Sequence, residues 1–251
     1  MAEQGATVPA FYARRGGRAA NWWTLLHPPY TAWHLSYVAL GAAMAPSLDW
    51  FALVLSLLAF FLAVGLSAHA LDELQGRPLG TRIGDGTLKA VAMGALVGAV
   101  ALGVYGVWFH GPTNWLLALA VPVGALLVVG YNLELFGGRL HTDAGFAWAW
   151  GGFPVAVGYV AQSPTLMVGS LAAAVAAVLA GVGMSAAQRA LSTRARGLRR
   201  RTEEVSGTIR HRDGQVETIT RETLLAPAEQ ALRALSWALP LLAAAALLAH
   251  A

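Results

Sequence analysis

The sequence predicts an all-α protein, a polytopic transmembrane bundle of about seven helices with a small cytoplasmic β-hairpin. Of its 251 residues, 57% are hydrophobic and 12% are charged, and the mean hydropathy is +0.55. Soluble domains carry about 25% charged residues, so this composition indicates an integral membrane protein. The apolar residues form several runs near the roughly 20 residues that a spanning helix needs. The chain has no cysteine, which excludes disulfides and thiol chemistry.

Breaks rich in glycine, proline and polar residues divide the apolar runs. Pro46 and Asp49 mark the first break, Gly111 and Pro112 a later one, and Pro164 another, since these residues favour turns. The expected spans are residues 29–47, 50–74, 88–109, 114–133, 144–162, 165–189 and 228–250.

The last span contains Glu229, Arg233 and Pro240, so it could also begin as an interfacial helix before it enters the bilayer. Four parts follow from these spans: a cytoplasmic amino-terminal segment (1–28), a bundle of about six helices (29–193), a cytoplasmic basic loop with the hairpin (194–225) and a final membrane helix (226–251).

The basic residues predict the direction of insertion. All 17 Lys and Arg residues precede the first span or follow the second, fourth and sixth spans, up to the start of the seventh. Because cytoplasmic loops carry an excess of Lys and Arg, we expect a cytoplasmic amino terminus and an external carboxyl terminus, in an inner or plasma membrane. The sequence pI near 9.8 then reflects topology, and nucleic acid is not an expected partner, whereas the lipid bilayer is.

The stretch VSGTIRHRDGQVETIT alternates in strand fashion around Asp213-Gly214, a strong signal for a tight hairpin turn. The basic run RARGLRRR precedes it. The favoured interpretation is a solvated loop with anchoring arginines, and the alternative is a lid or a contact with lipid headgroups.

A polar cluster closes the second span. His69, Asp72 and Glu73 are three and four residues apart, so the spacing places them on one face of a helix. Ionisable groups in membrane helices are costly and usually mark function. We expect Asp72 or Glu73 to hold a divalent cation, with His69 as a further ligand or as a hydrogen-bond donor. Carboxylate oxygens favour Mg²⁺, and an added imidazole would allow Zn, Mn or Fe instead. The alternative is a polar helix end paired with Arg77 or Arg82.

Other polar residues collect at the same cytoplasmic level. Tyr131 and Asn132 end the fourth span and could orient a substrate. Three basic residues could bind a diphosphate or a lipid phosphate, or serve only as the positive charges that mark the cytoplasmic side: Arg77, Arg82 and Lys89. Three further residues, Glu134, His141 and Asp143, could complete a metal site or form a solvated loop.

Within the spans, structural roles are favoured. His34 is expected to be a hydrogen-bonded structural residue, and Asp85 to cap the third span. Trp22 and Trp23 fit an interfacial belt. The aromatic residues Trp148, Trp150, Phe153 and Tyr159 could line a tunnel for a prenyl chain, although packing is the commoner role. The glycines Gly151, Gly152 and Gly158 are expected to allow close helix contact.

Over residues 22–190 the order of these motifs resembles the UbiA-type intramembrane prenyltransferases. The likeness rests on LLHPPYTAWHLSYVALGA in the first span, on the acidic cluster followed by GRPLGTRIGDGTLKA, and on GYNLELFGGRL before GFAWAWGGFPVAVGYVAQ. That family joins an isoprenyl diphosphate to an acceptor inside a bundle of about nine helices, and two acidic motifs hold its magnesium ions.

The resemblance implies a site at the cytoplasmic mouth of the bundle. The implied catalytic residues are Asp72, Glu73 and Tyr131, and the implied substrate-binding residues are Arg77, Arg82, Asn132, Arg139 and Arg189. The implied function is a Mg²⁺-dependent prenyltransferase that acts on an isoprenyl diphosphate or a related prenyl lipid.

The chain departs from both acidic motifs of the family. Asp72 and Glu73 are adjacent instead of four residues apart, and His69 stands near the position of the family's Asn. The second motif is replaced by GVGMSAAQRALSTRARG, which has no carboxylate, and Arg189 could pair with phosphate there instead of a second ion. A non-catalytic prenyl-lipid-binding or scaffold protein is therefore the alternative function, and a transporter ranks last.

Overall fold

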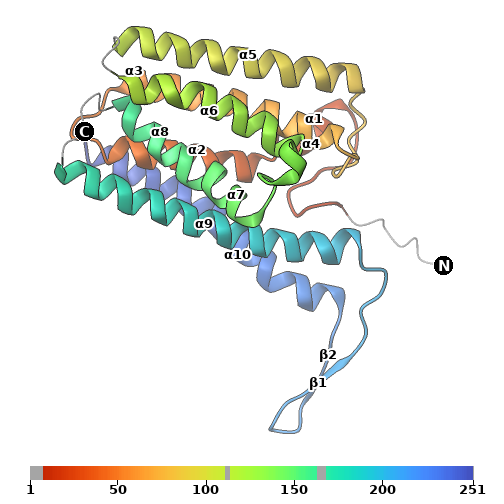
Figure 1. The fold of residues 1–251 in the computed structure, drawn as a ribbon. Helices are drawn as coiled ribbons and strands as arrows, with labels where there is room; N and C mark the ends of the chain where they lie inside the picture. Colours follow the sequence, from red (N-terminus) through yellow and green to blue (C-terminus); the bar gives the residue numbers. More distant parts are fainter. Residues whose placement is uncertain (1–7, 111–113, 163–167, 251) are drawn as a thin grey trace.

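The computed structural model describes residues 8–110, 114–162 and 168–250. Helices dominate, and one two-stranded sheet projects from the bundle (Figure 1). The helices before the hairpin are α1 (Arg18–Leu26), α2 (Pro28–Ala43), α3 (Trp50–Phe60), η1 (Phe61–Ala68), α4 (His69–Leu74), α5 (Asp85–His110), α6 (Trp115–Asn132), η2 (Phe136–Gly138), α7 (Asp143–Ala147), η3 (Trp148–Gly152), α8 (Phe153–Gln162) and α9 (Val168–Arg200). The strands β1 (Thr208–Arg210) and β2 (Val216–Thr218) and the helix α10 (Arg221–Leu248) follow.

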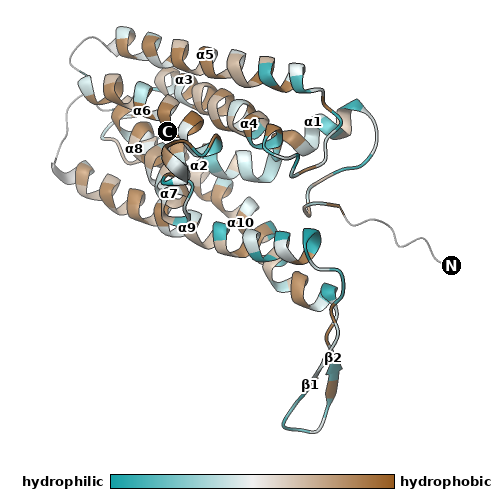
Figure 2. Ribbon diagram, turned by 45° about the vertical axis from the view of Figure 1, so that its right-hand side comes forward, coloured by the Kyte–Doolittle hydropathy of each residue, from teal (hydrophilic) through white to brown (hydrophobic). Residues whose placement is uncertain are grey.

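Five helical segments of the described chain are long and apolar enough to cross a membrane. They are Trp50–Leu74, Asp85–Phe109, Trp115–Asn132, Ser170–Arg200 and Arg221–Leu248. The first of these combines α3, η1 and α4, where η1 is a π-helical segment. The apolar composition of these helices, coloured brown in Figure 2, agrees with the membrane protein that the sequence predicts.

The helices stack in layers across the bundle. In Figure 1, α5 forms one outer layer above α3 and α6, while α9 and α10 lie on the opposite side, with α2 and α8 between them. Helix α2 packs against both α8 and α10, and α9 packs against η3 and α10. The described chain starts at one end of the bundle and finishes at the other. We call the end that carries the loops 75–84, 133–142 and 201–220 the polar end.

The core surrounds α2. Trp33 and Tyr37 are fully buried there, and the Trp33 indole donates a hydrogen bond to the Tyr37 hydroxyl at 2.6 Å. The backbones of α2 and α8 touch, because a Cβ on Gly158 would lie 2.1 Å from the Val38 carbonyl oxygen. Small residues allow such approaches in membrane helices, which agrees with the expectation for Gly158.

Turn chemistry explains several helix starts. The Asp49 carboxylate caps α3 by accepting from the backbone nitrogens of Phe51 and Ala52 at 2.8 and 3.2 Å. The predicted turn at Pro46–Asp49 is therefore confirmed. The predicted turns at Gly111, Pro112 and Pro164 lie outside the described residues.

The predicted hairpin is confirmed, whereas the predicted basic loop begins too early. Strands β1 and β2 pair antiparallel, with Thr208 opposite Thr218, around a Gly214 with φ of 90°. Helix α9, however, continues to Arg200 instead of ending near residue 189. Arginine, leucine and alanine favour helix, so α9 extends beyond its apolar part. Helix α1 also forms within the segment 1–28, for which no helix was predicted.

Candidate functional site

A polar cavity of about 410 Å³ opens at the polar end of the bundle. Its walls come from the segment around Pro9–Tyr12, from α2, η1, α4, α6 and η3, and from the last turns of α9. The hydrophilic residues, teal in Figure 2, gather toward this end. Five of the predicted site residues line it: His69, Asp72, Tyr131, Asn132 and Arg189.

Three histidines of this cavity make the same kind of hydrogen bond, from the ring Nδ1 to a backbone carbonyl. The Nδ1 atoms of His34, His69 and His141 lie 2.9, 3.1 and 3.1 Å from the carbonyl oxygens of Trp150, Gly65 and Tyr131. A carbonyl only accepts hydrogen bonds, so each neutral ring carries its proton on Nδ1 and offers Nε2 as an acceptor.

Two of these carbonyls belong to π-helical segments. Gly65 lies within η1, and Trp150 lies within η3. The wider π turn changes the pairing of backbone carbonyls, and such turns occur frequently at functional sites. The prediction that His34 is a hydrogen-bonded residue thus has a concrete partner, the Trp150 carbonyl.

His27 adds a fourth imidazole, which the sequence did not single out. Its ring stacks on His69 with centroids 4.1 Å apart, and its backbone is left-handed, with φ of 47°. Its Nε2 is buried and has no hydrogen-bond partner among the residues that the structure describes. Burial, and then the neighbouring His69, lower the pKa of His27 well below its usual value of 6.5. His27 is therefore neutral at physiological pH.

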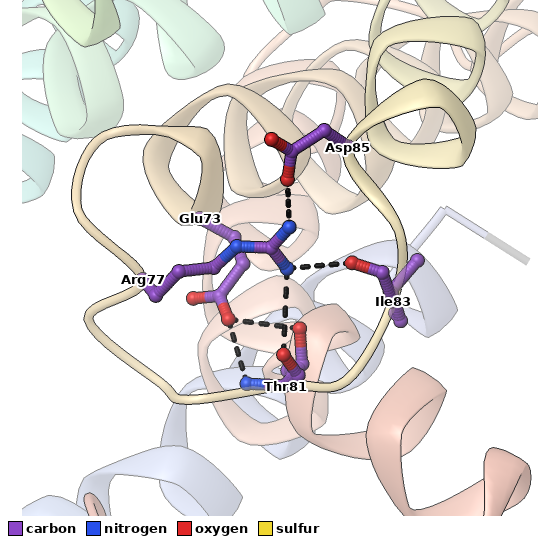
Figure 3. Close-up of polar contacts among 5 residues, drawn as sticks. All are labelled: Glu73, Arg77, Thr81, Ile83 and Asp85. Carbon is purple, nitrogen blue, oxygen red and sulfur yellow. Dashed lines mark hydrogen bonds and ion pairs between the residues drawn. The ribbon is translucent and has the colours of Figure 1, made fainter.

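The two adjacent carboxylates have different roles. Asp72 lines the cavity. Glu73 is fully buried, and its Oε1 accepts from the backbone nitrogen and hydroxyl of Thr81 at 2.7 and 2.8 Å. Its Oε2 accepts from the Leu79 nitrogen at 2.9 Å. Figure 3 shows this carboxylate turned toward the loop that follows α4.

The predicted three-ligand metal site does not form in the part of the chain that the structure describes. There, no three His, Asp or Glu side chains gather closely enough to hold an ion. Consecutive residues of a helix point about 100° apart, which explains why Asp72 and Glu73 diverge. We therefore assign no step to a metal held by His69, Asp72 and Glu73 together.

Three predicted basic residues, Arg77 and Arg82 of the 75–84 loop and Lys89 at the start of α5, do not line the cavity. Arg77 forms an ion pair with Asp85, and its guanidinium donates to the Ile83 carbonyl at 2.6 Å, as Figure 3 shows. Arg82 and Lys89 are exposed, and Arg82 joins Asn21 only through its backbone nitrogen. These residues thus hold the loop or face solvent. Arg139 is likewise exposed.

The residues that follow α6 form a smaller polar cluster. Asp143 accepts from the Arg189 Nε at 3.0 Å, and the Glu134 carboxylate lies 3.8 Å from the His141 ring. The Tyr131 ring stacks on His141 with centroids 4.4 Å apart. The Arg189 charge is therefore already paired, which weakens the predicted role of this residue as a phosphate ligand.

Two arginines of the basic run, which the sequence assigned to membrane anchoring or to a lid or headgroup contact, line the cavity. Arg196 donates to the Thr193 hydroxyl at 3.1 Å, and the Arg200 Nε donates to the Pro9 carbonyl at 3.1 Å. Neither has a carboxylate within ion-pair distance among the described residues. Asp72 interacts with both only over a longer range. Arg196 follows Arg189 by seven residues, and Arg200 follows Arg196 by four. This spacing puts all three on one helix face, a sequence signal that could have grouped them as candidate site residues.

A second, apolar cavity of about 100 Å³ lies among α3, α5, α6 and α8. Val64 and Trp150 line both cavities, so the two are adjacent. Phe153 and Trp150 line the apolar cavity. Trp148 and Tyr159 do not line it: Trp148 lines a separate apolar cavity with Phe153, and the Tyr159 hydroxyl lies 2.8 Å from the Ser170 hydroxyl.

Comparisons with family models, curated proteins and solved structures found no match for this chain.

Proposed function

We propose that this chain is a membrane-embedded prenyltransferase that binds an isoprenyl diphosphate, or a related prenyl lipid, at the polar end of its bundle. The supporting observation is the polar cavity with Arg196 and Arg200, which adjoins an apolar cavity at Val64 and Trp150. Arginine forms strong bidentate hydrogen bonds with phosphate oxygens, and an apolar cavity stabilises a hydrocarbon chain. A prenyl diphosphate has both of these parts.

The proposal includes the topology. Helix α2 and the segment formed by α7, η3 and α8 cross the membrane together with the five long helices, which gives seven spans. The polar end carries the basic loops and faces the cytoplasm, so the carboxyl terminus lies outside. The protein then resides in an inner or plasma membrane, and its order of motifs supports a UbiA-like bundle.

The charge balance supports an anionic ligand. Arg77, Arg189 and Arg199 pair with carboxylates, whereas Arg196 and Arg200 contact uncharged oxygens. For a diphosphate between the latter two, the guanidinium groups would take the place of hydrating water, which reduces the free-energy cost of desolvation. In this proposal the arginines supply charge that the family takes from metal ions. Dependence on Mg²⁺, with Asp72 as a carboxylate that lines the cavity, is an outcome of the test.

The experiment measures binding of farnesyl diphosphate and of farnesol to the purified protein in detergent, with Mg²⁺ and with a chelator. We expect the diphosphate to bind at least about tenfold more tightly than the alcohol, since 1.4 kcal/mol corresponds to that factor. Arg196→Gln and Arg200→Gln should each remove this preference. Arg210→Gln, in the exposed strand β1, is the matched control and should retain it. Equal binding of both ligands would contradict the proposal.

A non-catalytic prenyl-lipid-binding protein is the second candidate. It is favoured by Glu73, whose carboxylate holds a loop instead of facing the cavity. Release of diphosphate from farnesyl diphosphate, with several small alcohols and phenols offered as acceptors, separates the two functions. An enzyme should release it and lose this activity in Asp72→Asn. A binding protein should retain the intact lipid in both forms.

A further inference from the structure

Trp148 lines an apolar groove on the outside of the bundle. The groove has a volume of about 410 Å³ and lies between α6, α9 and the segment formed by α7, η3 and α8. Trp148 is 54% exposed, so the groove opens away from the core. Both α6 and α9 are long and apolar enough to cross a membrane, and the opening therefore faces hydrocarbon. We call this groove, whose lining includes Leu140, Trp148, Ala156 and Val178, the side groove.

The side groove has the reach of an acyl chain within one leaflet. Leu140, in the loop after α6, lines the part nearest the polar end of the bundle. From Gly145 to Ala156 the lining follows a helical segment of about 16 Å, at 1.5 Å per residue. The hydrocarbon core of a bilayer is about 30 Å thick, so this length matches one leaflet. A chain that fills the groove makes van der Waals contacts that an empty groove would lack.

The loop between α6 and α7 exposes apolar side chains at the same end. Leu135 and Phe136 are 39% and 62% exposed. The backbone of Phe136 is left-handed, with φ of 59°, which is uncommon for a residue other than glycine. The Leu135 nitrogen donates to the Gly130 carbonyl at 2.9 Å, which ties the loop to α6. Exposed apolar side chains at the end of a spanning helix fit the boundary between lipid headgroups and acyl chains.

Arg139 adds a cation to this loop, directly before Leu140. Arg139 is exposed, and none of the ion pairs among the described residues includes it. The carboxylate of the same loop, Glu134, lies 3.8 Å from the His141 ring. A guanidinium at the headgroup level attracts anionic lipids and can bind a phosphate through two hydrogen bonds. The loop thus places an anion-binding group beside one end of an apolar groove.

We propose that the side groove and Arg139 form a binding site for an anionic phospholipid of the surrounding bilayer. One acyl chain lies in the groove against Trp148 and Ala156, and the phosphate contacts Arg139. Leu135 and Phe136 enter the interface beside the headgroup. A phospholipid has both the chain that the groove fits and the charge that the arginine complements.

This lipid is a resident partner and not a substrate. The side groove shares Tyr131 with the polar cavity, but Arg196 and Arg200 do not line it. The inference therefore goes beyond the proposed prenyl transfer and does not depend on it.

The test titrates the delipidated full chain in detergent with phosphatidylglycerol and with phosphatidylcholine of the same acyl chains, and native mass spectrometry measures each bound lipid. We expect phosphatidylglycerol to bind about fivefold more tightly, since one basic residue near a membrane surface contributes about this factor. Arg139→Gln should remove the preference. Arg82→Gln, which changes an exposed arginine of the 75–84 loop at the same end, is the matched control and should keep it.

A second variant tests the groove itself. Ala156→Phe fills part of it and should weaken the binding of both lipids several-fold. Ala101→Phe, on the exposed face of α5, is its control and should bind both lipids as the unmodified protein does. If Ala156→Phe does not fold, Arg139→Gln decides alone, because Arg139 is exposed and its replacement leaves the packing intact.

Equal affinity for the two lipids, or a preference that persists in Arg139→Gln, would overturn the proposal. An equal loss in Arg82→Gln would do the same, because the effect would then come from general surface charge. A lipid-free dimer that Ala156→Phe separates would assign the groove to a second copy of the chain and would also overturn it.

Discussion

The Glu73 carboxylate accepts two hydrogen bonds from Thr81, one from the backbone nitrogen at 2.7 Å and one from the hydroxyl at 2.8 Å. A third bond comes from the Leu79 nitrogen at 2.9 Å. The carboxylate therefore fixes the loop that connects α4 to α5, and it does so from a fully buried position.

Removing this carboxylate should destabilise the protein. Glu73→Ala leaves two backbone nitrogens and a hydroxyl without their partner, at about 1–3 kcal/mol for each buried group. We expect a clear loss of thermal stability in detergent, measured as a lower Tm. Asp72→Asn, on the adjacent cavity-facing residue, should shift the Tm little. Equal losses in the two variants would show that Glu73 is not the residue that fixes the loop.

Close contact between α2 and α8 predicts a strong effect of single methyl groups. A Cβ on Gly41 would lie 1.9 Å from the Val155 carbonyl oxygen, and a Cβ on Gly158 would lie 2.1 Å from that of Val38. Gly41→Ala and Gly158→Ala should force the helices apart and destabilise by several kcal/mol, since overpacking typically costs about 1–3 kcal/mol or more.

Gly183 provides the control for these variants. It lies in α9, and a methyl group added to its Cα would have nothing within 4 Å. Alanine favours helix over glycine by about 1 kcal/mol, so Gly183→Ala should keep or raise the Tm. A Tm for Gly158→Ala as high as that of Gly183→Ala would contradict the contact between the helices.

The ion pair between Arg199 and Glu229 joins α9 to α10. Two hydrogen bonds of 2.5 and 2.8 Å connect the side chains, which are 15% and 10% exposed. Because removal of one partner leaves a buried charge, Arg199→Met should cost about 3–5 kcal/mol. The double variant Arg199→Met, Glu229→Leu should recover most of this loss in a thermal unfolding experiment. A double variant no more stable than Arg199→Met would argue against a charge effect.

His27 predicts a dependence of stability on pH. Its pKa is lowered in the folded state, chiefly by burial, so the unfolded chain binds a proton more readily. The groups that surround it or act on its charge are Tyr12, Tyr30, His34, His69, Arg196 and Arg200. The His27 contribution is fully present above pH 6.5 and is lost as the pH falls below that value toward the lowered pKa.

The measurement is the Tm between pH 7.5 and 5. We expect His27→Gln to flatten the decline, by up to about 1.4 kcal/mol for each pH unit, because one proton is involved. The variant His211→Gln, on the exposed turn of the hairpin, is the control and should decline as the unmodified protein does. Parallel declines in His27→Gln and the unmodified protein would exclude His27 as the cause.

Hydrophobicity and turn residues were enough to predict much of the fold. The apolar runs correspond to helices, the predicted turn forms at Pro46–Asp49, and Asp213-Gly214 lies in the hairpin turn. The predicted end of helix α9, near residue 189, was wrong because a hydrophobicity pattern stops where the apolar residues stop. Helical residues such as those between Arg189 and Arg200 continue the helix without that signal.

The site was less predictable, because its residues depend on partners far away in the sequence. Asp72 and Glu73 look equivalent in sequence. In the structure, the backbone of the loop after α4 donates a hydrogen bond from Thr81 to the Glu73 carboxylate, whereas Asp72 lines the cavity. The sequence suggests Arg189 as a phosphate ligand, but in the structure its Nε donates a hydrogen bond to the Asp143 carboxylate. The spacing of Arg196 and Arg200 from Arg189 places them on one helix face, but that spacing does not say whether the face lines a cavity, as it does in the structure.

The hairpin has a practical consequence for experiments on orientation. All six residues of β1 and β2 are exposed, and the turn at Asp213-Gly214 lies away from the bundle in Figure 1. A fluorescent protein or protease site inserted there would leave the helix packing intact, because no buried contact depends on these strands. The hairpin is thus a natural position for a reporter of sidedness, which would reveal directly which compartment the arginine-rich mouth faces.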